Sequence, residues 1–420
     1  MSAMSVGRRL AEASGALCLL CALMAMAIEP GRAQTFTVLH DFTGGNDGAA
    51  PAAGVTPDTA GNLYGTTTIG GAMGLGIVFH LARTGDTWRL YPLYAFNGLN
   101  DLRDGFDPLA GVVIGRDGEV YGTTHSGGDG NGCMQWYGCG TLFHIAPGRT
   151  AHQWQEVIFH RFGDADGSNP DRGDLTFDAA GHLYGTTRNG GAYQQGTVFE
   201  LTEDPRGFWT ENVLYGFAGS PDGAAPLSGI AIDEQGSLYG TTSAGGASGY
   251  GAVYRLLNSG SGWTEEVLYS FGNGADGLTP TGGMLVDSAG ILYGATQDGG
   301  PGAGGVVFEL SPLGEDSWSF QTLAELSGPS SGGPASNLIM DNEGNLYGTT
   351  VGDGALHWGS VFKLTRSGGG WSYQSLHDFS GGMDGGTPYG RLSVGDHGEL
   401  YGTASAGGAY GQGVVFEIVP

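Results

Sequence analysis

Seven copies of one five-residue motif constrain the fold of this chain more than any other feature of the sequence. The copies read LYGTT, VYGTT, LYGTT, LYGTT, LYGAT, LYGTT and LYGTA, and their tyrosines are Tyr64, Tyr121, Tyr184, Tyr239, Tyr293, Tyr347 and Tyr401. They recur with a period of about 54 residues, which is typical of propellers and solenoids. Because such repeats share one architecture, we expect a single domain over residues 34–420.

Each repeat divides into four segments with the alternation of β-strands. In one such segment Trp263, Glu265, Val267, Tyr269 and Phe271 fall on one face, a period of two rather than 3.6. Turn sequences separate the segments: a tight Asp-rich hairpin, a Gly-Gly loop, and an Asp-Gly-x-x-Pro crossover loop to the next repeat. Four antiparallel strands per repeat predict the blade of a β-propeller.

The two ends of the repeat region predict how the ring closes. Residues 36–42 read as a fourth strand without a blade, and residues 414–418 end the chain after a third strand. We therefore expect the N-terminal strand to complete the last blade, which removes two exposed sheet edges. The predicted fold class is an all-β, seven-bladed β-propeller with four antiparallel strands per blade.

The repeat resembles a known bacterial family. The order LYGTT, Gly-Gly, G-x-V-F-x-L, Trp, Phe, Asp-Gly and Pro is similar to that of the GloVer (Gloeo/Verruco) tandem-repeat proteins, over nearly all of residues 35–420. The resemblance implies an exported propeller at the cell surface or secreted, and it implies no activity. The strand order is also similar, at fold level only, to that of NHL propellers and streptogramin lyases.

The N-terminus has the pattern of a secretory signal peptide, which we place at residues 1–33. Arg8 and Arg9 precede an apolar run at residues 17–28, and cleavage is expected after Ala33 or, alternatively, after Ala27. That run is too short to span a membrane comfortably, and no second one follows. Cys133 and Cys139 would remain after cleavage, and we expect them to form a disulfide in a secreted, extracellular or periplasmic protein.

The charge of the chain narrows the class of partner. There are 42 acidic residues against 16 Lys and Arg, a formal net charge of −26. An acidic surface repels phosphate backbones, so nucleic acid is a poor partner, whereas neutral sugars, cations and basic proteins remain compatible. We expect a monomer.

Aspartates recur in the crossover loops and could bind a cation. Six of the seven loops contain one: Asp47, Asp104, Asp166, Asp222, Asp276 and Asp384. A ring of carboxylates at the mouth of the central channel would suit Ca²⁺, the one cofactor that the sequence suggests. The alternative is that each aspartate caps its own turn through nearby backbone amides.

The second repeat is irregular and carries the other candidate residues. Its crossover loop contains Asp101, Arg103 and Asp104, His125 follows its LYGTT-type motif, and its Gly-Gly loop is extended. A disulfide-braced loop that presents Trp136 and Tyr137, together with Trp358 of the sixth repeat, would suit a sugar ring or a partner protein. The alternative is that these aromatic residues cover the core between blades.

These features favour a binding or structural module for carbohydrate or a partner protein over an enzyme. The sequence contains no GxSxG elbow, HExxH motif or P-loop. A propeller lyase or hydrolase with acids at the channel mouth is the alternative.

Overall fold

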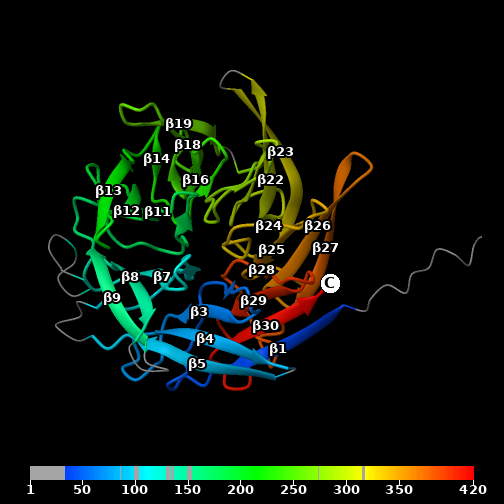
Figure 1. Ribbon diagram of the computed structural model, residues 1–420. Coiled ribbons are helices and arrows are strands. Elements are labelled where there is room, and N and C mark those ends of the chain that lie inside the picture. The colour runs from blue at the N-terminus through cyan, green and yellow to red at the C-terminus, as the bar shows by residue number, and fades with distance from the viewer. Residues whose placement is uncertain are drawn as a thin grey trace, which may run out of the picture. The chain divides into compact units, whose positions relative to one another are not determined.

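The computed structural model describes residues 34–420 except 86, 99–103, 129–132, 134–136, 149–153, 273 and 315–316. The fold lies within one unit of the chain, Phe36–Val419. Seven four-stranded antiparallel sheets follow one another around a ring (Figure 1). The predicted all-β seven-bladed propeller is confirmed, and the predicted signal peptide lies outside the described residues.

The blades are numbered in chain order, and the first strand of each is innermost (Figure 1). Blades 1 to 4 consist of β2 (Thr56–Pro57), β3 (Leu63–Thr67), β4 (Ile77–Thr84) and β5 (Thr87–Ala95); β6 (Val113–Ile114), β7 (Val120–Thr124), β8 (Thr141–Pro147) and β9 (Trp154–Arg161); β10 (Thr176–Phe177), β11 (Leu183–Thr187), β12 (Thr197–Glu203) and β13 (Trp209–Gly216); β15 (Ala231–Ile232), β16 (Leu238–Thr242), β18 (Ala252–Asn258) and β19 (Trp263–Ser270).

Blades 5 to 7 consist of β20 (Leu285–Val286), β21 (Leu292–Ala295), β22 (Ala303–Gly314) and β23 (Ser317–Ser327); β24 (Ile339–Met340), β25 (Leu346–Thr350), β26 (Ser360–Ser367) and β27 (Gly370–Asp378); β28 (Ser393–Val394), β29 (Leu400–Ala404), β30 (Val414–Val419) and β1 (Thr35–Asp41). A two-stranded ribbon, β14 (Gly223–Ala224) with β17 (Ala244–Gly245), lies between blades 3 and 4. No helix occurs among the described residues, so none there could span a membrane.

The N-terminal strand closes the ring as predicted. β1 pairs with β30, and Figure 1 shows the blue strand beside the red one. The amide of Phe42 donates to the Gly413 carbonyl at 3.1 Å, and the Ala409 amide donates to Asp41 Oδ1 at 2.6 Å. The sheet edge of β30 is therefore paired with the other end of the fold.

Each residue type in the LYGTT motif has its own role in the packing. The leucines are fully buried, as Leu63 is. A Cβ atom on Gly65 would lie 2.6 Å from Phe79 Cζ, so the third-strand ring needs glycine beneath it. The first threonine reaches the next blade, as Thr66 Oγ1 does when it donates to the Ala110 carbonyl at 2.8 Å. The motif therefore packs its own blade and bonds to the following one.

A proline and a glycine join neighbouring blades. Ala225 lies in the left-handed region at φ 53°, and its amide donates to the Gln195 carbonyl of the preceding blade at 2.8 Å. The next residue, Pro226, would lie 2.6 Å from a Cβ on Gly196, whose φ is +97°. Only glycine fits there. The same contact recurs at Gly76 with Pro108, Gly140 with Pro170, Gly251 with Pro280, Gly359 with Pro388, and Gly413 with Pro51.

The two sets of long loops share one face of the ring. Each crossover loop pairs with the Gly-Gly loop of the next blade, as Ser168 pairs with Asn189 and Leu278 with Asp298. We call this side, formed by the Gly-Gly and crossover loops, the loop face. The opposite side, formed by the turns between first and second and between third and fourth strands, is the turn face.

Candidate functional site

The centre of the loop face is closed by side chains that break the sevenfold symmetry. Asp174 Oδ2 lies 2.5 Å from Arg391 Nε, and Asp174 Oδ1 accepts a hydrogen bond from the Gly111 amide at 2.6 Å. Asp174, Arg391 and Gly111 lie just before the first strands of blades 3, 7 and 2, respectively. Both carboxylate oxygens are thus committed to holding three blades together.

Arg172 completes this central group. Its guanidinium lies 4.2 Å from the Tyr389 ring, a cation–π contact, and its Nε atom is buried without a hydrogen-bond partner. The cavity at this level is about 20 Å³, enough for a water molecule and too small for a sugar ring. Asp174 is the only acid among the described residues that line it. At this level the side chains therefore hold the blades together, and the cavity between them is too small for an organic ligand.

Exposed aromatic and apolar side chains surround this closed centre on the loop face. Tyr193 is 62% exposed and Tyr410 is 61% exposed, at matching positions in the Gly-Gly loops of blades 3 and 7. Six of the seven Gly-Gly loops carry such a residue: Met73, Tyr137, Tyr193, Tyr250, Leu356 with Trp358, and Tyr410. Blade 5 carries none among its described Gly-Gly loop residues. Flat side chains on glycine-rich supports form a surface suited to stacking.

Trp358 is held more firmly than the tyrosines. Cβ atoms on Gly381 and Gly386 would lie 2.4 and 3.0 Å from its indole, so the ring packs against the glycines of the next crossover loop. It is nevertheless 43% exposed. The packing and binding interpretations of this residue are therefore compatible.

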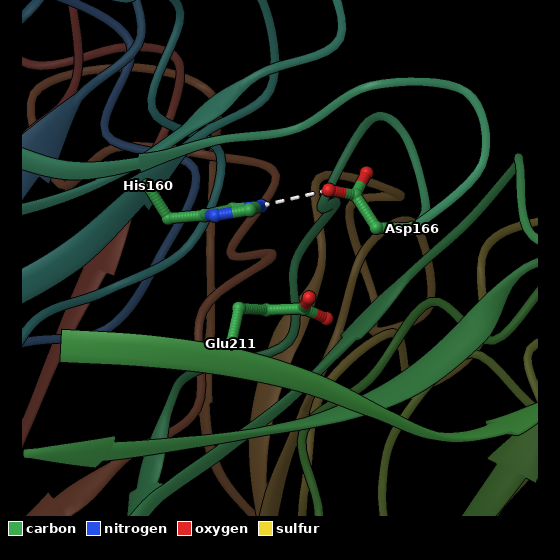
Figure 2. A group of neighbouring side chains, drawn as sticks. All are labelled: His160, Asp166 and Glu211. Carbon is green, nitrogen blue, oxygen red and sulfur yellow. Dashed lines mark ion pairs between the residues drawn. The ribbon is translucent and has the colours of Figure 1, made fainter.

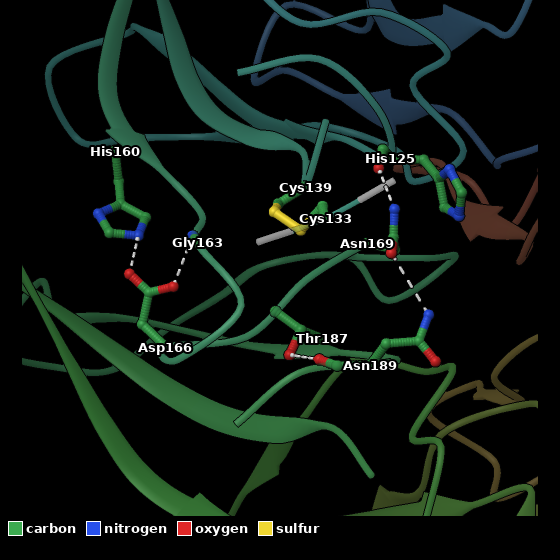
Figure 3. The surroundings of a disulfide bond; sticks show 9 residues. All are labelled: His125, Cys133, Cys139, His160, Gly163, Asp166, Asn169, Thr187 and Asn189. Atoms are coloured by element: carbon green, nitrogen blue, oxygen red, sulfur yellow. Dashed lines mark hydrogen bonds and ion pairs between the residues drawn. A yellow bond between two sulfur atoms is a disulfide. The ribbon is translucent and has the colours of Figure 1, made fainter. Parts of the chain in front are cut away.

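The predicted disulfide between Cys133 and Cys139 is present, with Cα atoms 5.5 Å apart. The disulfide joins two residues of the blade 2 Gly-Gly loop (Figure 3). This loop contacts the next crossover loop, because the Asn169 amide donates to the Cys139 carbonyl at 2.7 Å. Asn169 Nδ2 also donates to the His125 carbonyl at 3.1 Å.

The blade 2 candidates that lie among the described residues have separate contacts. His125 Nδ1 lies 3.1 Å from Ser126 Oγ, whereas Asp104 accepts hydrogen bonds from Tyr94 and Asn97. Tyr137 is 60% exposed on the loop face. Asp101, Arg103 and Trp136 lie outside the described residues.

The six aspartates do not form a ring at the channel mouth, which corrects that expectation. Each caps its own crossover loop and contacts a histidine or tyrosine on the fourth, outermost strand. Asp222 Oδ2 accepts the Ala218 amide at 2.7 Å and the Tyr215 hydroxyl at 3.1 Å. The equivalent partners are His40 for Asp47, Tyr94 for Asp104, His160 for Asp166, Tyr269 for Asp276 and His377 for Asp384. The turn-capping interpretation describes their contacts.

Three glutamates that the sequence analysis did not select lie beside these aspartates, across the seams between blades. Burial and the neighbouring Asp104 carboxylate raise the pKa of Glu156 to about 8. Burial and a neighbouring aspartate also raise the pKa of Glu211 and of Glu265 to about 7. Each acid is two residues after a fourth-strand tryptophan on the inward face, and that placement is the sequence signal that could have identified them.

The turn face is not featureless either. A cleft of about 460 Å³ lies between blades 2 and 3, and its lining includes Arg116, Tyr121, His182 and Trp209. This cleft is an alternative location for a ligand, on the side opposite the loop face.

The protein family described as the Gloeobacter/Verrucomicrobia repeat matches this chain over residues 132–317 and 232–420. This chain belongs to that family. The extracellular domain of a protein assigned as a one-component system of B. thetaiotaomicron has a similar structure. The TM-score is 0.55 at 10% identity, over 90% of this chain and 39% of that one, so our chain spans about two fifths of its length. No curated protein sequence matches the chain.

Two further solved structures are similar over most of their own length. One is a protein from Thermus thermophilus assigned as an oxidoreductase (glucose dehydrogenase), with a TM-score of 0.44 at 19% identity, over 74% of this chain and 96% of that one. The other is a protein of unknown function from Dyadobacter fermentans, with a TM-score of 0.45 at 13% identity, over 81% and 98%. At such identities the likeness concerns the fold alone.

Proposed function

We propose that this member of the Gloeobacter/Verrucomicrobia repeat family is a binding module outside the cytoplasm that recognises a neutral carbohydrate on its loop face. The observation that carries the proposal is the set of exposed aromatic side chains on the Gly-Gly loops around a closed channel. The disulfide and the predicted signal peptide support a location outside the cytoplasm.

Tyrosine suits a sugar ring for two reasons. Its flat face stacks on the apolar face of the sugar, and its hydroxyl can bond to the hydroxyls at the sugar's rim. In blade 3, Gln194 and Gln195 directly follow Tyr193 and can supply further polar contacts. Because the chain has a formal net charge of −26, a neutral glycan is favoured over an acidic one.

A partner protein is the second candidate, and one observation favours it. Met73, Leu356 and Met383 are exposed on the same face and have no ring to stack on a sugar. Flexible methionines are common on protein-binding surfaces. The enzyme alternative draws no specific support from the channel, because Asp174 is fixed by Arg391 and Gly111.

Retention in gels that contain soluble β-glucan, xylan, mannan or starch would test the proposal, with an anionic pectin for comparison. We expect retention by at least one neutral polysaccharide and none by pectin. Tyr193→Ala should weaken binding by about 2 kcal/mol, roughly thirtyfold, if the ring stacks on the ligand.

Phe208→Ala is the matched control, because Phe208 is 65% exposed on the turn-face hairpin between β12 and β13. It should bind as the wild type does. Retention by no neutral polysaccharide, or equal losses in the two variants, would contradict carbohydrate binding on the loop face.

A further inference from the structure

Three side chains with metal-ligating atoms converge in the seam between blades 2 and 3. His160 lies near the end of β9, Asp166 lies in the following crossover loop, and Glu211 lies on β13 (Figure 2). One nitrogen or oxygen atom from each lies within 4.8 Å of the other two, and all three residues are partly buried. Among the described residues this is the only such group of three.

The backbone fixes this arrangement. Asp166 Oδ1 accepts the Gly163 amide at 2.7 Å, which turns Oδ2 toward His160 Nε2 at 3.2 Å. Glu211 reaches the same point from the neighbouring blade (Figure 2). A second contact that orients a ligating carboxylate is a usual feature of metal sites.

Two of the three groups have buried polar atoms that lack hydrogen-bond partners. His160 Nε2 lies at ion-pair distance from Asp166 but outside hydrogen-bond geometry, and Glu211 Oε1 has no partner. Both atoms are shielded from water. Unpaired buried polar atoms are costly unless a further group satisfies them.

The other seams provide an internal comparison. The neighbouring seams keep both acids but replace the histidine with tyrosine: Tyr94 with Asp104 and Glu156, and Tyr215 with Asp222 and Glu265. There the tyrosine hydroxyl donates a hydrogen bond to the aspartate at 3.2 or 3.1 Å. In the seam between blades 6 and 7 the histidine is His377. There Phe36 stands at the position equivalent to Glu211, and its ring stacks on the His377 imidazole with the ring centroids 3.8 Å apart.

We propose that His160, Asp166 and Glu211 bind a Zn²⁺ ion between blades 2 and 3. An imidazole with two carboxylates suits Zn²⁺ and discriminates against Ca²⁺, which prefers oxygen ligands alone. Three protein ligands leave a coordination position for water or for a bound molecule. A surface depression lined by Gly163, Asp166, Gln194 and Val213 includes one of the three ligands, Asp166. The depression borders the Gly-Gly loop that carries Tyr193.

Calorimetric titration of the purified, EDTA-treated protein with ZnCl2, and separately with CaCl2, tests the site. We expect one Zn²⁺ per chain, a higher Tm with Zn²⁺, and no equivalent response to Ca²⁺. His160→Tyr should abolish Zn²⁺ binding and should fold, because the neighbouring seams carry tyrosine at this position. Glu211→Gln gives a second variant that should lose the same binding.

A gain-of-function variant sharpens the test. Tyr215→His places an imidazole beside Asp222 and Glu265, so this variant should bind two Zn²⁺ ions. The proposal is overturned if the wild type binds no Zn²⁺, or if both His160→Tyr and Glu211→Gln bind it as the wild type does. A single Zn²⁺ bound by Tyr215→His contradicts the role assigned to the imidazole. None of these readouts depends on carbohydrate binding, so this proposal and the proposed function can fail separately.

Discussion

Single residues explain why the repeat is so regular and where it departs from regularity. The motif residues recur in every blade because they pack it, and their leucines and tyrosines are mostly buried. The acids of the seams, Glu156, Glu211 and Glu265, share a place two residues after a fourth-strand tryptophan, but the sequence does not show which groups of the neighbouring blade they approach. The two interpretations of the crossover aspartates could not be separated from the sequence, which shows a recurring Asp-Gly but not that His or Tyr on the outermost strand bonds to it.

The raised pKa of Glu156 predicts a pH dependence of stability. The folded state keeps this proton up to about pH 8, whereas the unfolded chain loses it near 4.5. The stabilisation is therefore complete below about pH 4.5 and is lost as the pH rises toward 8. In urea unfolding at pH 5 and pH 8, Glu156→Gln should lose less stability than the wild type between the two values. Equal losses would show that Glu156 does not titrate in this window.

Tyr254 predicts a stabilising substitution. It is almost fully buried on the third strand of blade 4, its hydroxyl has no hydrogen-bond partner, and the other blades carry phenylalanine at this position. Tyr254→Phe should raise the free energy of unfolding by about 1 kcal/mol. Phe199→Tyr is the converse change and should lower it. A drop in the Tm of Tyr254→Phe would reveal a bonding partner for the hydroxyl.

At the scale of elements, the strands and turns follow the sequence closely. The Gly-Gly and Asp-Gly-x-x-Pro segments predicted the two loop types, and the structure pairs them on one face, as Ser168 pairs with Asn189. The extent of the first strands was harder to predict. They pair over only two residues, as Thr176 and Phe177 do, and the residues just before several of them line the central cavity.

The contact between Gly196 and Pro226 predicts a position-specific cost of adding a methyl group. Gly196→Ala places a Cβ 2.5 Å from the Thr187 carbonyl and 2.6 Å from Pro226, at φ +97°. Strain and overpacking together should cost about 3 kcal/mol. Gly181→Ala is the matched control, because its φ is +98° and nothing lies within 4 Å. It should cost about 1 kcal/mol, from strain alone. Equal costs in thermal unfolding would refute the interblade contact.

At the scale of the whole molecule, sevenfold closure was predicted from the chain ends. The group of side chains that fills the centre of the ring was not predicted. Closure follows from counting strands, whereas Arg172 and Asp174 of blade 3 are far in the sequence from Tyr389 and Arg391 of blade 7, and their contacts form only in three dimensions. The proposed binding surface on the loop face therefore rests on a ring whose N-terminal strand pairs with β30 and whose centre is filled by these side chains.

Phe42 tests how firmly the closing strand is held. It is fully buried between blades 7 and 1, as Phe217 is between blades 3 and 4. Phe42→Ala and Phe217→Ala should each cost about 4 kcal/mol in denaturant unfolding. A much smaller cost at Phe42 would show that the terminal strand exchanges on and off the last blade.

Amide hydrogen–deuterium exchange, with and without the polysaccharide that retains the protein best, would locate the binding surface on the intact propeller. We predict slower exchange in the Gly-Gly loops of blades 3, 4 and 7, at residues 188–196, 243–251 and 405–413, and no change in the hairpins of the turn face. Protection confined to the turn-face cleft around Arg116 and His182, or no protection at all, would contradict recognition by the loop face.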